Sequence, residues 1–257
     1  MTDMMSKANI RTIVVDLDGT LLRGDKTISA HTQAVLKACK ERGIRVIVAT
    51  ARPFRAMQQY CAAVDFDAFV VSNGAKVICP GRDTLNRIHP SSAGQLLTVL
   101  SACPGMRITL ETGENAYSNR PIEDYKTNIR EDLVSIANQE DILKIIVHLD
   151  TPETAATVKA ALSEDLYISV SAGYMMQIMD RSASKWNGIQ TVLHTIGGTP
   201  EETMYFGDDH DDIQPIRMCG LGVAVANAIE PVKAAADCIA QSNDNDGVAK
   251  FIEQYLL

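Results

Sequence analysis

The sequence has no closely spaced cysteine pair and no long apolar run. Its 257 residues contain six cysteines, none of them in a Cys-x-x-Cys pair, so neither a disulfide framework nor a zinc site is expected. No apolar run approaches the roughly 20 residues that cross a bilayer, and residues 1–11 contain no signal-peptide core. We therefore expect a soluble, cytoplasmic protein with no membrane partner.

Basic residues are also in the minority. Lys and Arg together number 24 against 32 Asp and Glu, which gives a net charge of −8. Nucleic-acid phosphates select basic surfaces, so a nucleic-acid partner is not expected. No block of like charge is long enough to form an interaction tail, and no internal repeat is present. At this length the chain can form one large domain or two smaller ones.

A pair of carboxylates near the N-terminus is the most informative feature that the sequence does contain. The apolar run Ile13–Val15 predicts a buried strand, and Gly19 marks the turn after it. Asp16 and Asp18 therefore stand where that strand ends. Burial of two charges is costly unless a cation or dense hydrogen bonding compensates. The pair indicates a site that uses both carboxylates together with a divalent metal, and a plain polar turn is the alternative.

Strands and helices alternate on both sides of the middle of the chain. Residues 29–42 have helical spacing, with Ser29 as a candidate N-cap and Gly43 as the stop. The other elements expected here are strands at 44–49, 68–71, 203–206 and 221–225 and helices at 53–63 and 185–196. Such alternation is typical of βαβ units in a parallel sheet. The predicted fold class is α/β, with a doubly wound core built on a parallel sheet.

The pattern changes between the two parts of this core. The elements expected there are two strands with alternating apolar and polar positions and two helices, at 107–110, 144–149, 91–101 and 152–163. Alternation of this kind indicates a sheet with one solvated face, as in α+β units. We therefore predict that residues 1–81 and 182–257 form the core and that residues 82–181 form an inserted α+β domain.

Polar residues follow five of the predicted core strands, and these residues are Asp16, Thr50, Asn73, Asp208 and Asn227. In open α/β sheets, ligands bind at the carboxyl ends of the parallel strands. Residues that are far apart in the sequence should therefore meet at one edge of the sheet. A set of unrelated surface turns has no reason to show this regularity.

A second acidic cluster spans Asp208–Asp212. It holds four carboxylates in five residues, interrupted by His210. Oxygen ligands suit a hard cation, and a site that shares its ion with a substrate phosphate suits Mg²⁺. The acidic N-terminus of a helix is the alternative explanation, above all for Asp211 and Asp212.

The order of these motifs resembles that of the haloacid dehalogenase (HAD) superfamily. The matching motifs are Asp16–Thr20, Thr50–Arg52, Lys185 and Gly207–Asp212. The insertion at 82–181 resembles the C2 cap of the Cof-type phosphatase branch (subclass IIB), and Ser242–Ala249 is similar to the C-terminal segment of that branch. The resemblance implies a Rossmann-like core that carries the chemistry and a cap that sets substrate specificity.

The resemblance also implies a Mg²⁺-dependent phosphatase that acts on small phosphorylated metabolites. Asp16 would attack phosphorus and form an aspartyl-phosphate. Asp18 would protonate the leaving alkoxide and then activate the water that hydrolyses the intermediate. Lys185 and Thr50 would offset charge on the phosphoryl oxygens.

Metal and substrate ligands are implied in the same way. Mg²⁺ would bind the Asp16 carboxylate, the Asp18 main-chain carbonyl and Asp208. Asp212 would hold a metal-bound water or a ligand. The residues expected to bind substrate, two of them through nearby backbone N–H groups, are Leu17, Ala51, Arg52, Asn73, Gly74 and Asn227.

The sequence departs from the family's pattern at four positions. These are Ala51, Trp186 and Ala226, where glycine is usual, and Asp211, where asparagine is typical. None of the four changes removes a catalytic group. Asp211 adds a negative charge beside the expected metal.

Two other functions stay open on the same fold, because a fold does not determine a function. They are a non-catalytic phosphometabolite sensor or assembly subunit, and a phosphomutase. Residues 242–253 also match part of a calcium-binding EF-hand loop, although Ser242 stands where Asp is required. Sugar phosphates, pyridoxal phosphate and flavin mononucleotide all fit the family as substrates. No pattern indicates the oligomeric state.

Overall fold

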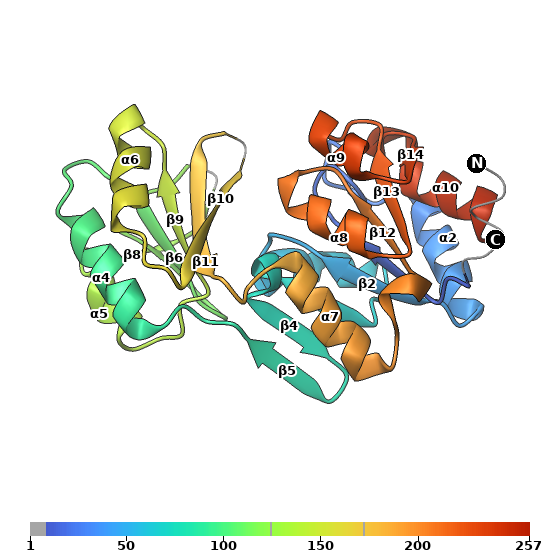
Figure 1. Cartoon of the computed structure of the whole chain (residues 1–257), viewed down its shortest axis with the longest axis horizontal. Coiled ribbons are helices and arrows are strands. Elements are labelled where there is room, and N and C mark those ends of the chain that lie inside the picture. The colour runs from blue at the N-terminus through green and yellow to red at the C-terminus, as the bar shows by residue number, and fades with distance from the viewer. Residues whose placement is uncertain (1–8, 124, 172) are drawn as a thin grey trace. The chain divides into compact units, whose positions relative to one another are not determined.

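The structure is a computed structural model that describes residues 9–123, 125–171 and 173–257. Two compact units make up the fold (Figure 1). One comprises residues up to Thr84 together with Ser184–Leu257, and the other comprises Leu85–Ala183. Residues 1–8, which make up most of the N-terminal segment searched for a signal sequence, lie outside the described residues.

The limits of the second unit differ slightly from the predicted insertion at 82–181. Strand β5 (Arg82–Leu85) is the edge strand of the first unit's sheet, beside β4 (Lys76–Cys79). The first unit keeps residues 82–84 because they pair in its sheet. The chain passes back from the second unit to the first at Ser184, the N-cap of helix α7 (Lys185–Ile196).

The described part of the first unit contains an eight-stranded sheet of order β14-β13-β12-β1-β2-β3-β4-β5. Its strands from β14 to β3 run parallel, and β4 is antiparallel to β3. The parallel strands are β1 (Thr12–Val15), β2 (Arg45–Ala49), β3 (Ala68–Val71), β12 (Thr203–Gly207), β13 (Leu221–Val225) and β14 (Cys238–Ala240). The predicted parallel sheet is confirmed, and the β4–β5 hairpin is an addition to it.

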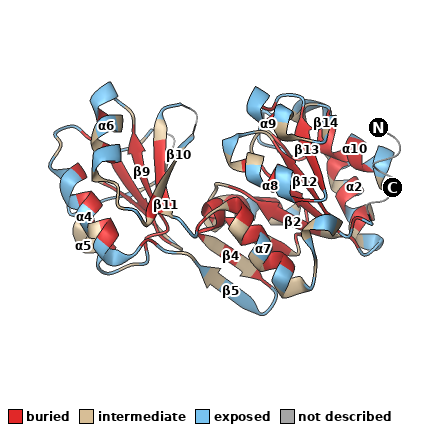
Figure 2. Ribbon diagram, in the orientation of Figure 1, coloured by how far each residue is buried: buried red, intermediate tan, exposed pale blue. Residues whose placement is uncertain are grey.

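Helices cover both faces of this sheet (Figure 1). On one face, α2 (Ala30–Glu41) packs with α10 (Gly247–Tyr255); on the other lie α7, α8 (Ile213–Met218) and α9 (Glu230–Ala235). Strands that are covered on both faces are apolar without alternation. Every residue of β1 is accordingly buried, and so is every residue of β12, which is labelled in Figure 2. Because β1 is central, the polar residues that follow it lie in the middle of the sheet edge.

The predicted helix at 53–63 is wrong as a continuous element. The structure has a short helix α3 (Phe54–Met57) followed by a 3₁₀ helix η1 (Gln58–Ala62). Pro53 provides no side-chain cap, and the buried residues Met57 and Tyr60 are three apart, which suits the 3₁₀ period. The other 3₁₀ turns are η2 (Ser72–Gly74), η3 (Pro200–Glu202), η4 (His210–Asp212) and η5 (Asn243–Asn245). Within the described ranges, no helix is both long and apolar enough to cross a membrane.

The second unit is an α+β unit, which confirms the predicted fold class. Its described residues form a sheet of order β10-β11-β9-β6-β7-β8. The strands are β6 (Ile108–Glu111), β7 (Ala116–Ser118), β8 (Asn128–Ile129), β9 (Lys144–His148), β10 (Leu166–Ser171) and β11 (Met175–Asp180). Helices α4 (Pro90–Ser101), α5 (Leu133–Ala137) and α6 (Pro152–Ala161) pack against one face and form a separate apolar core with it.

The other face of this second sheet is polar. Alternation places Glu111, Lys144 and Gln177 on it. Lys144 Nζ lies 2.6 Å from Gln177 Oε1, and Tyr125 donates a hydrogen bond to Glu111. The predicted solvated face is wrong for β6 and β9, in which every residue is buried. Lys144 therefore bonds Gln177 and Glu111 accepts from Tyr125, so these buried polar side chains have partners within the unit.

Candidate active site

The parallel strands of the first unit end along one edge, and polar residues follow them there. Asp16 follows β1, Thr50 follows β2, Asn73 lies in η2 after β3, and Asp208 and Asn227 come after β12 and β13. The Asp16 N–H donates to the Phe206 carbonyl at 3.0 Å, which ties the ends of β1 and β12 together. This carboxyl edge is where open α/β sheets bind ligands.

Lys185 lies between two carboxylates at this edge. Its Nζ is 2.8 Å from Asp16 Oδ1 and 2.6 Å from Asp212 Oδ1, and its side chain is only 4% exposed. Lys185 is the first residue of α7, and Ser184 caps that helix by accepting from the Asn187 N–H at 3.0 Å. The ammonium group is therefore held by a fixed helix start rather than by a loop.

Gly74 lets the start of α7 approach the sheet edge. Its φ is +87°, and a Cβ at this position would lie 2.1 Å from the Ser184 carbonyl oxygen. Only glycine tolerates both the left-handed backbone and this close approach. Gly74 was predicted to bind substrate, and its contact in the structure is with the residue that precedes Lys185.

Asp212 is completely buried and organises the turn after β12. Its Oδ1 accepts from Lys185 and, at 2.5 Å, from the Tyr205 hydroxyl. Its Oδ2 accepts from the backbone N–H groups of Asp208 and Asp209 at 2.9 and 3.0 Å. One carboxylate thus fixes both the lysine and the backbone that carries Asp208.

Negative charge dominates this cluster. Burial raises the pKa of Asp16 well above its usual value, and the nearby Asp212 and Asp208 add to the shift while Lys185 opposes it. Burial opposes the charge on Lys185, but Asp16 and Asp212 outweigh burial and raise its pKa well above the usual value. The carboxylates outnumber the buried ammonium, so a further cation would stabilise the cluster.

Asp18 is held by two cationic side chains. Arg52 donates through Nε to Oδ2 at 2.5 Å and through Nη2 to Oδ1 at 2.7 Å, and Lys26 Nζ donates to Oδ1 at 2.8 Å. Burial alone would raise the pKa of Asp18, but the hydrogen bonds and charges of Arg52 and Lys26 outweigh burial and lower the pKa to about 2. The carboxylate is therefore charged at neutral pH and held in one orientation.

Asp208 contacts the turn that follows β1. Thr20 Oγ1 donates to its Oδ1 at 2.5 Å. Gly19, at φ +77°, leaves room for the carboxylate, since a Cβ there would lie 2.4 Å from Asp208 Oδ2. Burial raises the pKa of Asp208 to about 6, which the Thr20 hydrogen bond opposes and the charge of Asp212 increases.

The geometry of the cluster fits a small divalent cation. Among the described residues, Asp16, Asp208 and Asp212 offer carboxylate oxygens that all lie within 4.8 Å of one another. Oxygen-only donors at this spacing suit Mg²⁺. A bound cation would also relieve the repulsion that adds to the effect of burial on the carboxyl pKa values. Three of the four residues predicted to hold the metal are therefore brought together through their carboxylates, and the assignment of ligands stays a prediction.

Thr50 and Asn73 make contacts within the same edge. Thr50 Oγ1 accepts from the Arg52 N–H at 3.2 Å, which shapes the turn after β2. The Asn73 side-chain amide donates to Asp211. The charge that Asp211 adds to the family's pattern is thus bound by an amide that comes from another strand end.

Three other predicted residues lie on the neighbouring turns. The Leu17 side chain is fully buried in the apolar core, so only its backbone is available to a ligand. Ala51 is half-buried in the turn after β2. Asn227 donates through Nδ2 to the Gly19 carbonyl at 2.7 Å. Trp186, one of the departures, packs in the core rather than beside the carboxylates.

Sequence reasoning missed three residues of this cluster. Lys26 is a loop lysine whose position carries no spacing signal. Tyr205 lies inside the apolar run of β12, where it reads as a core residue. Thr20 belongs to the Asp16–Thr20 motif, and its position at the end of that motif was the one available signal.

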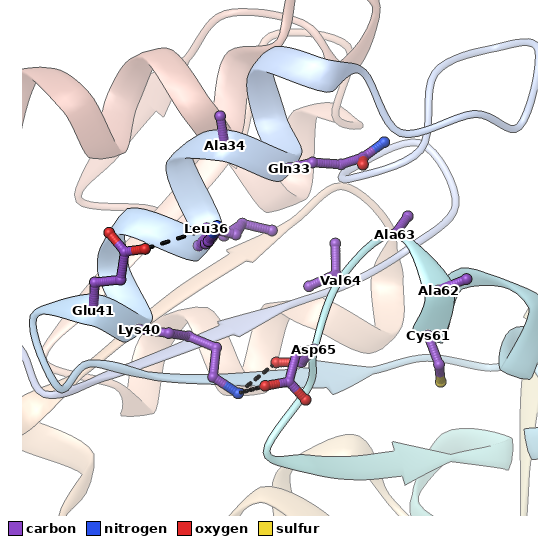
Figure 3. Close-up of a pocket in the computed structure, with 11 residues that line it drawn as sticks. Gln33, Ala34, Leu36, Lys40, Glu41, Cys61, Ala62, Ala63, Val64 and Asp65 are labelled. Carbon is purple, nitrogen blue, oxygen red and sulfur yellow. Dashed lines mark hydrogen bonds and ion pairs between the residues drawn. The ribbon is translucent and has the colours of Figure 1, made fainter.

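A pocket of about 600 Å³ lies elsewhere on the first unit (Figure 3). It is lined by residues of α2, among them Gln33 and Lys40, and by residues 61–65. Lys40 pairs there with Asp65 at 2.6 Å (Figure 3). None of the carboxylates described above lines this pocket.

Comparison with known proteins decides the family. Residues 13–252 match the model of the haloacid dehalogenase-like hydrolases. This chain belongs to that family. It is 28% identical over 262 residues to the 5-amino-6-(5-phospho-D-ribitylamino)uracil phosphatase YitU of Bacillus subtilis, covering 95% of this chain and 96% of the relative. The resemblance to the HAD superfamily is confirmed, and the chain is a hydrolase.

Solved structures share the whole fold with this hydrolase. A haloacid dehalogenase-like hydrolase from Bacteroides thetaiotaomicron is 26% identical, with a TM-score of 0.83 and coverage of 95% of this chain and 99% of that one. The HAD subclass IIB sugar phosphatase BT4131 has the same fold at 22% identity, with a TM-score of 0.81 and coverage of 95% and 98%. Both likenesses extend over nearly the whole of this chain, so the fold of the second unit is shared as well as that of the first.

Proposed function

We propose that this hydrolase is a Mg²⁺-dependent phosphatase of small phosphorylated metabolites that works through an aspartyl-phosphate. The arrangement of two carboxylates at the end of β1 carries the proposal. Lys185 Nζ donates to Asp16 Oδ1 at 2.8 Å, and Arg52 donates two hydrogen bonds to the Asp18 carboxylate. Asp16 is removed from water, as a nucleophile should be, and Asp18 is the second carboxyl group, which would donate and accept a proton.

In the first step, a carboxylate oxygen of Asp16 bonds to phosphorus while the bond from phosphorus to the alcohol oxygen breaks. The Asp18 carboxyl gives its proton to that oxygen, so the alcohol leaves neutral. A substrate phosphate beside Arg52 competes with Asp18 for this cation, which lets Asp18 take up the proton beforehand. Lys185 stabilises the charge that develops on the phosphoryl oxygens.

In the second step, water hydrolyses the aspartyl-phosphate. Asp18, now a carboxylate, takes a proton from the water as its oxygen bonds to phosphorus, and the bond from phosphorus to Asp16 breaks. Phosphate leaves and Asp16 is restored. Thr50 and the backbone N–H groups near Leu17 and Ala51 donate hydrogen bonds to the phosphoryl oxygens in both steps.

Asp16, Asp208 and the Asp18 carbonyl would hold Mg²⁺, which when bound offsets negative charge on the phosphoryl oxygens. The mutual spacing of the carboxylates and their raised pKa values support this assignment. Asp212 already accepts hydrogen bonds on both oxygens. We therefore propose that Asp212 does not bind the metal directly. Instead it holds Asp208 and a metal-bound water or ligand in position.

The alcohol part of the substrate is proposed to be a polyhydroxylated chain. The relative named above acts on a phosphoribityl compound, and the structural neighbour is named for sugar phosphates. Both names describe phosphate esters of polyols. Arg52 and Asn73 are the side chains that we propose to contact the substrate, while Gly74 and Asn227 support the turns beside it. Such metabolites are soluble, and we place the enzyme with them in the cytoplasm.

The second unit, Leu85–Ala183, is proposed as the cap that selects this alcohol. Its polar sheet face offers the charged and amide groups of Glu111, Lys144 and Gln177. Hydroxyl groups are recognised by donors and acceptors of this kind, and a buried polar group that loses its partner is costly. Discrimination between alcohols would then lie in the cap and the chemistry in the core.

The test is a panel of phosphorylated metabolites incubated with the purified protein and Mg²⁺. The panel holds sugar and polyol phosphates, flavin mononucleotide, pyridoxal phosphate and p-nitrophenyl phosphate. We expect inorganic phosphate to be released from polyol esters, and release to stop with EDTA or excess Ca²⁺, which prefers more ligands than this compact site offers. Formation of an isomer without free phosphate would indicate a mutase. Binding without any turnover would indicate a sensor, and full turnover in EDTA would exclude the metal.

A further inference from the structure

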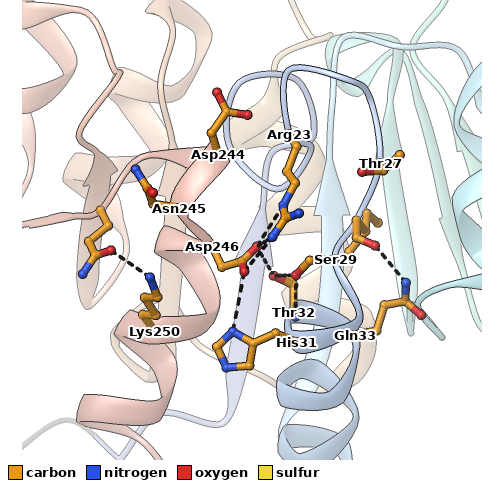
Figure 4. A network of polar contacts seen from close by, with 12 residues as sticks. Arg23, Thr27, Ser29, His31, Thr32, Gln33, Asp244, Asn245, Asp246 and Lys250 are labelled. Carbon is orange, nitrogen blue, oxygen red and sulfur yellow. Dashed lines mark hydrogen bonds and ion pairs between the residues drawn. The ribbon is translucent and has the colours of Figure 1, made fainter.

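The acidic segment Asn243–Asp246 fastens the loop that follows β1. Asn243 Nδ2 donates to the Leu22 carbonyl at 2.8 Å, and Asp244 Oδ1 accepts from the Gly24 N–H at 2.8 Å. Asp246 accepts from Arg23 Nη2 at 2.8 Å on both of its oxygens (Figure 4). The residues that resemble part of a calcium loop are therefore engaged with another part of the chain.

Asp246 is the hub of these contacts. Its side chain is 14% exposed, and Thr32 and His31 of α2 also face it, at 3.4 and 3.7 Å (Figure 4). Burial alone would raise the pKa of Asp246, but hydrogen bonds from Ser29 and Arg23 outweigh burial and lower it. A charged carboxylate thus holds Arg23 in place.

The loop held in this way carries Lys26 to Asp18. The Lys26 N–H donates to the Arg23 carbonyl at 2.9 Å, and the Arg23 N–H donates to the Thr27 carbonyl at 3.0 Å, so Arg23 and Lys26 belong to one tight turn. Lys26 has a left-handed backbone, with φ +64°. Its Nζ is 2.8 Å from Asp18 Oδ1. Fixing Arg23 therefore also fixes the ammonium group that contacts Asp18.

A second connection joins the same segment to the Asp18–Gly19 turn. The Asn243 N–H donates to Asn227 Oδ1 at 3.0 Å, and Asn227 Nδ2 donates to the Gly19 carbonyl at 2.7 Å. The C-terminal segment thus supports Asp18 from two sides, through the side chain of Lys26 and through the backbone of Gly19.

We propose that Asn243–Asp246 is a brace that positions the acid–base carboxylate Asp18, with Asp246, Arg23 and Lys26 as positioning residues. This inference rests on the proposed function, in which Asp18 transfers the proton of the leaving alcohol. A proton donor must stay within hydrogen-bond reach of the atom it serves. Loss of an outer partner of a reacting group typically lowers activity about 10-fold to 100-fold. A brace of this kind acts on one step, whereas a plain stabilising anchor acts on folding alone.

The dependence of rate on the leaving group separates these two roles. A sugar or polyol phosphate from the panel needs a proton on its leaving alkoxide, whereas p-nitrophenyl phosphate releases p-nitrophenolate, which is stable as an anion. The ratio kcat/KM reports only the steps up to release of the alcohol. For Asp246→Asn and Lys26→Met, we expect kcat/KM to fall about 10-fold for the polyol ester and less than about 2-fold for p-nitrophenyl phosphate.

Control variants test whether the loss of activity is specific to the brace. Glu253→Gln removes a charge from helix α10, which Asp246 precedes. Among the described residues Glu253 pairs with His31, at 3.0 Å, and the change should leave kcat/KM for both esters unchanged. Lys26→Arg should retain most of the wild-type rate. Because Lys26 is 56% exposed, Lys26→Met should fold even if Asp246→Asn does not, and thermal melting of each variant checks this.

Several outcomes would overturn the proposal. One is an equal fall in kcat/KM for both esters, or no change in kcat/KM for either, in variants whose melting temperature matches that of the wild type. Another is a rise in kcat/KM for the polyol ester when Lys26 is lost, because Lys26 would then restrain Asp18 rather than position it. A Ca²⁺-dependent rise in melting temperature that Asp246→Asn abolishes would instead identify a calcium loop. If the wild type itself cleaves neither ester, the proposed function fails, and that result is distinct from all of these.

Discussion

At the residue scale, the proposed chemistry depends on the ion pair between Lys185 and Asp16. Both side chains are less than a tenth exposed, and removing one partner of a buried pair leaves an uncompensated charge. Asp212 gives Lys185 a second partner at 2.6 Å. The lysine therefore keeps a counter-ion when Asp16 is neutralised, which makes Asp16 a residue that can be changed without unfolding the chain.

Asp16→Asn is expected to fold and to lose turnover. The amide has nearly the same shape and still accepts from Lys185, but it is a poor nucleophile. Phosphate release should fall by about 10⁴-fold or more, with a melting temperature close to that of the wild type. Asp209→Asn is the matched control, because this exposed side chain bonds backbone N–H groups of its own turn, at His210 and Asp212, and the amide oxygen can still accept from them, so activity should be retained. Turnover of Asp16→Asn near the wild-type level would contradict the assignment.

The affinity for Mg²⁺ is expected to rise with pH up to a value near the pKa of Asp208. Burial raises this pKa to about 6, and the proton must leave before a cation binds. Affinity should therefore increase about 10-fold or more per pH unit below about pH 6, where Asp208 holds its proton. Calorimetric titration across this range measures it, and equal affinity at both ends would exclude Asp208 as a ligand.

The raised pKa of Asp208 also predicts how the stability of the metal-free protein changes with pH. A carboxyl pKa that is higher in the folded chain than the usual 3.8 means that the folded state binds the proton more tightly than the unfolded state. Its stabilising contribution is complete below the unfolded value and is lost as pH rises through about 6. Mg²⁺ should restore stability above this range, and urea unfolding with and without the metal checks the sign.

Single residues differ in how far the sequence could predict them. Asp16, Asp208 and Asn73 could be placed because each follows an apolar run that reads as a strand, and parallel strands end at one edge. Lys26 could not, because an exposed loop lysine has no periodic signal and its contact with Asp18 depends on a turn held by a segment more than 200 residues away. The hydroxyl of Tyr205 was hidden because tyrosine is a common residue in apolar strands.

At the element scale, helix α7 and the turn η2 form the contact that places Lys185. Gly74 lies where the two meet, and Gly188 in α7 leaves similarly little room, since a Cβ there would lie 2.4 Å from Val70 Cγ1. Small residues on both sides allow the helix to pack directly on the sheet. The helix start, and with it the ammonium group, is fixed by this packing rather than by the loop before it.

Gly74→Ala is expected to destabilise the fold more than Gly43→Ala. Both glycines have a positive φ, +87° and +77°, so each alanine bears a left-handed cost of about 1 kcal/mol. Only at Gly74 would the Cβ also collide with backbone, and such overpacking adds about 1–3 kcal/mol. Urea unfolding gives the difference. Equal losses of stability in the two variants would show that the helix can move away at no cost.

Elements were predictable to different degrees for physical reasons. Five of the six parallel strands, all but β14, and helix α7 were recovered because continuous apolar runs and a capped 3.6-residue period are strong local signals. The β4–β5 hairpin was missed because Pro80-Gly81 indicates a turn without saying whether the flanking strands pair. Residues 53–63 were given a helix because their apolar spacing fits either a short α-helix or a 3₁₀ helix.

At the scale of the whole molecule, the chain holds two separate apolar cores. One lies around the parallel sheet, and the other lies between the second sheet and its helices α4, α5 and α6. Separate cores allow each unit to fold on its own residues. The proposed division of labour, with chemistry in one unit and selection in the other, depends on this independence.

Replacing Leu85–Ala183 by a short flexible linker is expected to remove discrimination between metabolites. The remaining unit keeps every carboxylate of the site, so it should still cleave p-nitrophenyl phosphate, although slowly because water is not excluded. The intact protein assayed on the same panel is the control. If the shortened protein is folded and keeps the full substrate ranking, selection does not lie in the second unit.

The most direct test of the account is to trap the covalent intermediate. A ³²P-labelled phosphate ester is mixed with the enzyme and Mg²⁺, quenched with acid within milliseconds, and the labelled peptide is identified. The account predicts label on the peptide that contains Asp16, none in Asp16→Asn, and more in Asp18→Asn when an activated ester is used, because hydrolysis of the intermediate then lacks its base. Turnover without label on the protein, or label on another residue, would contradict it.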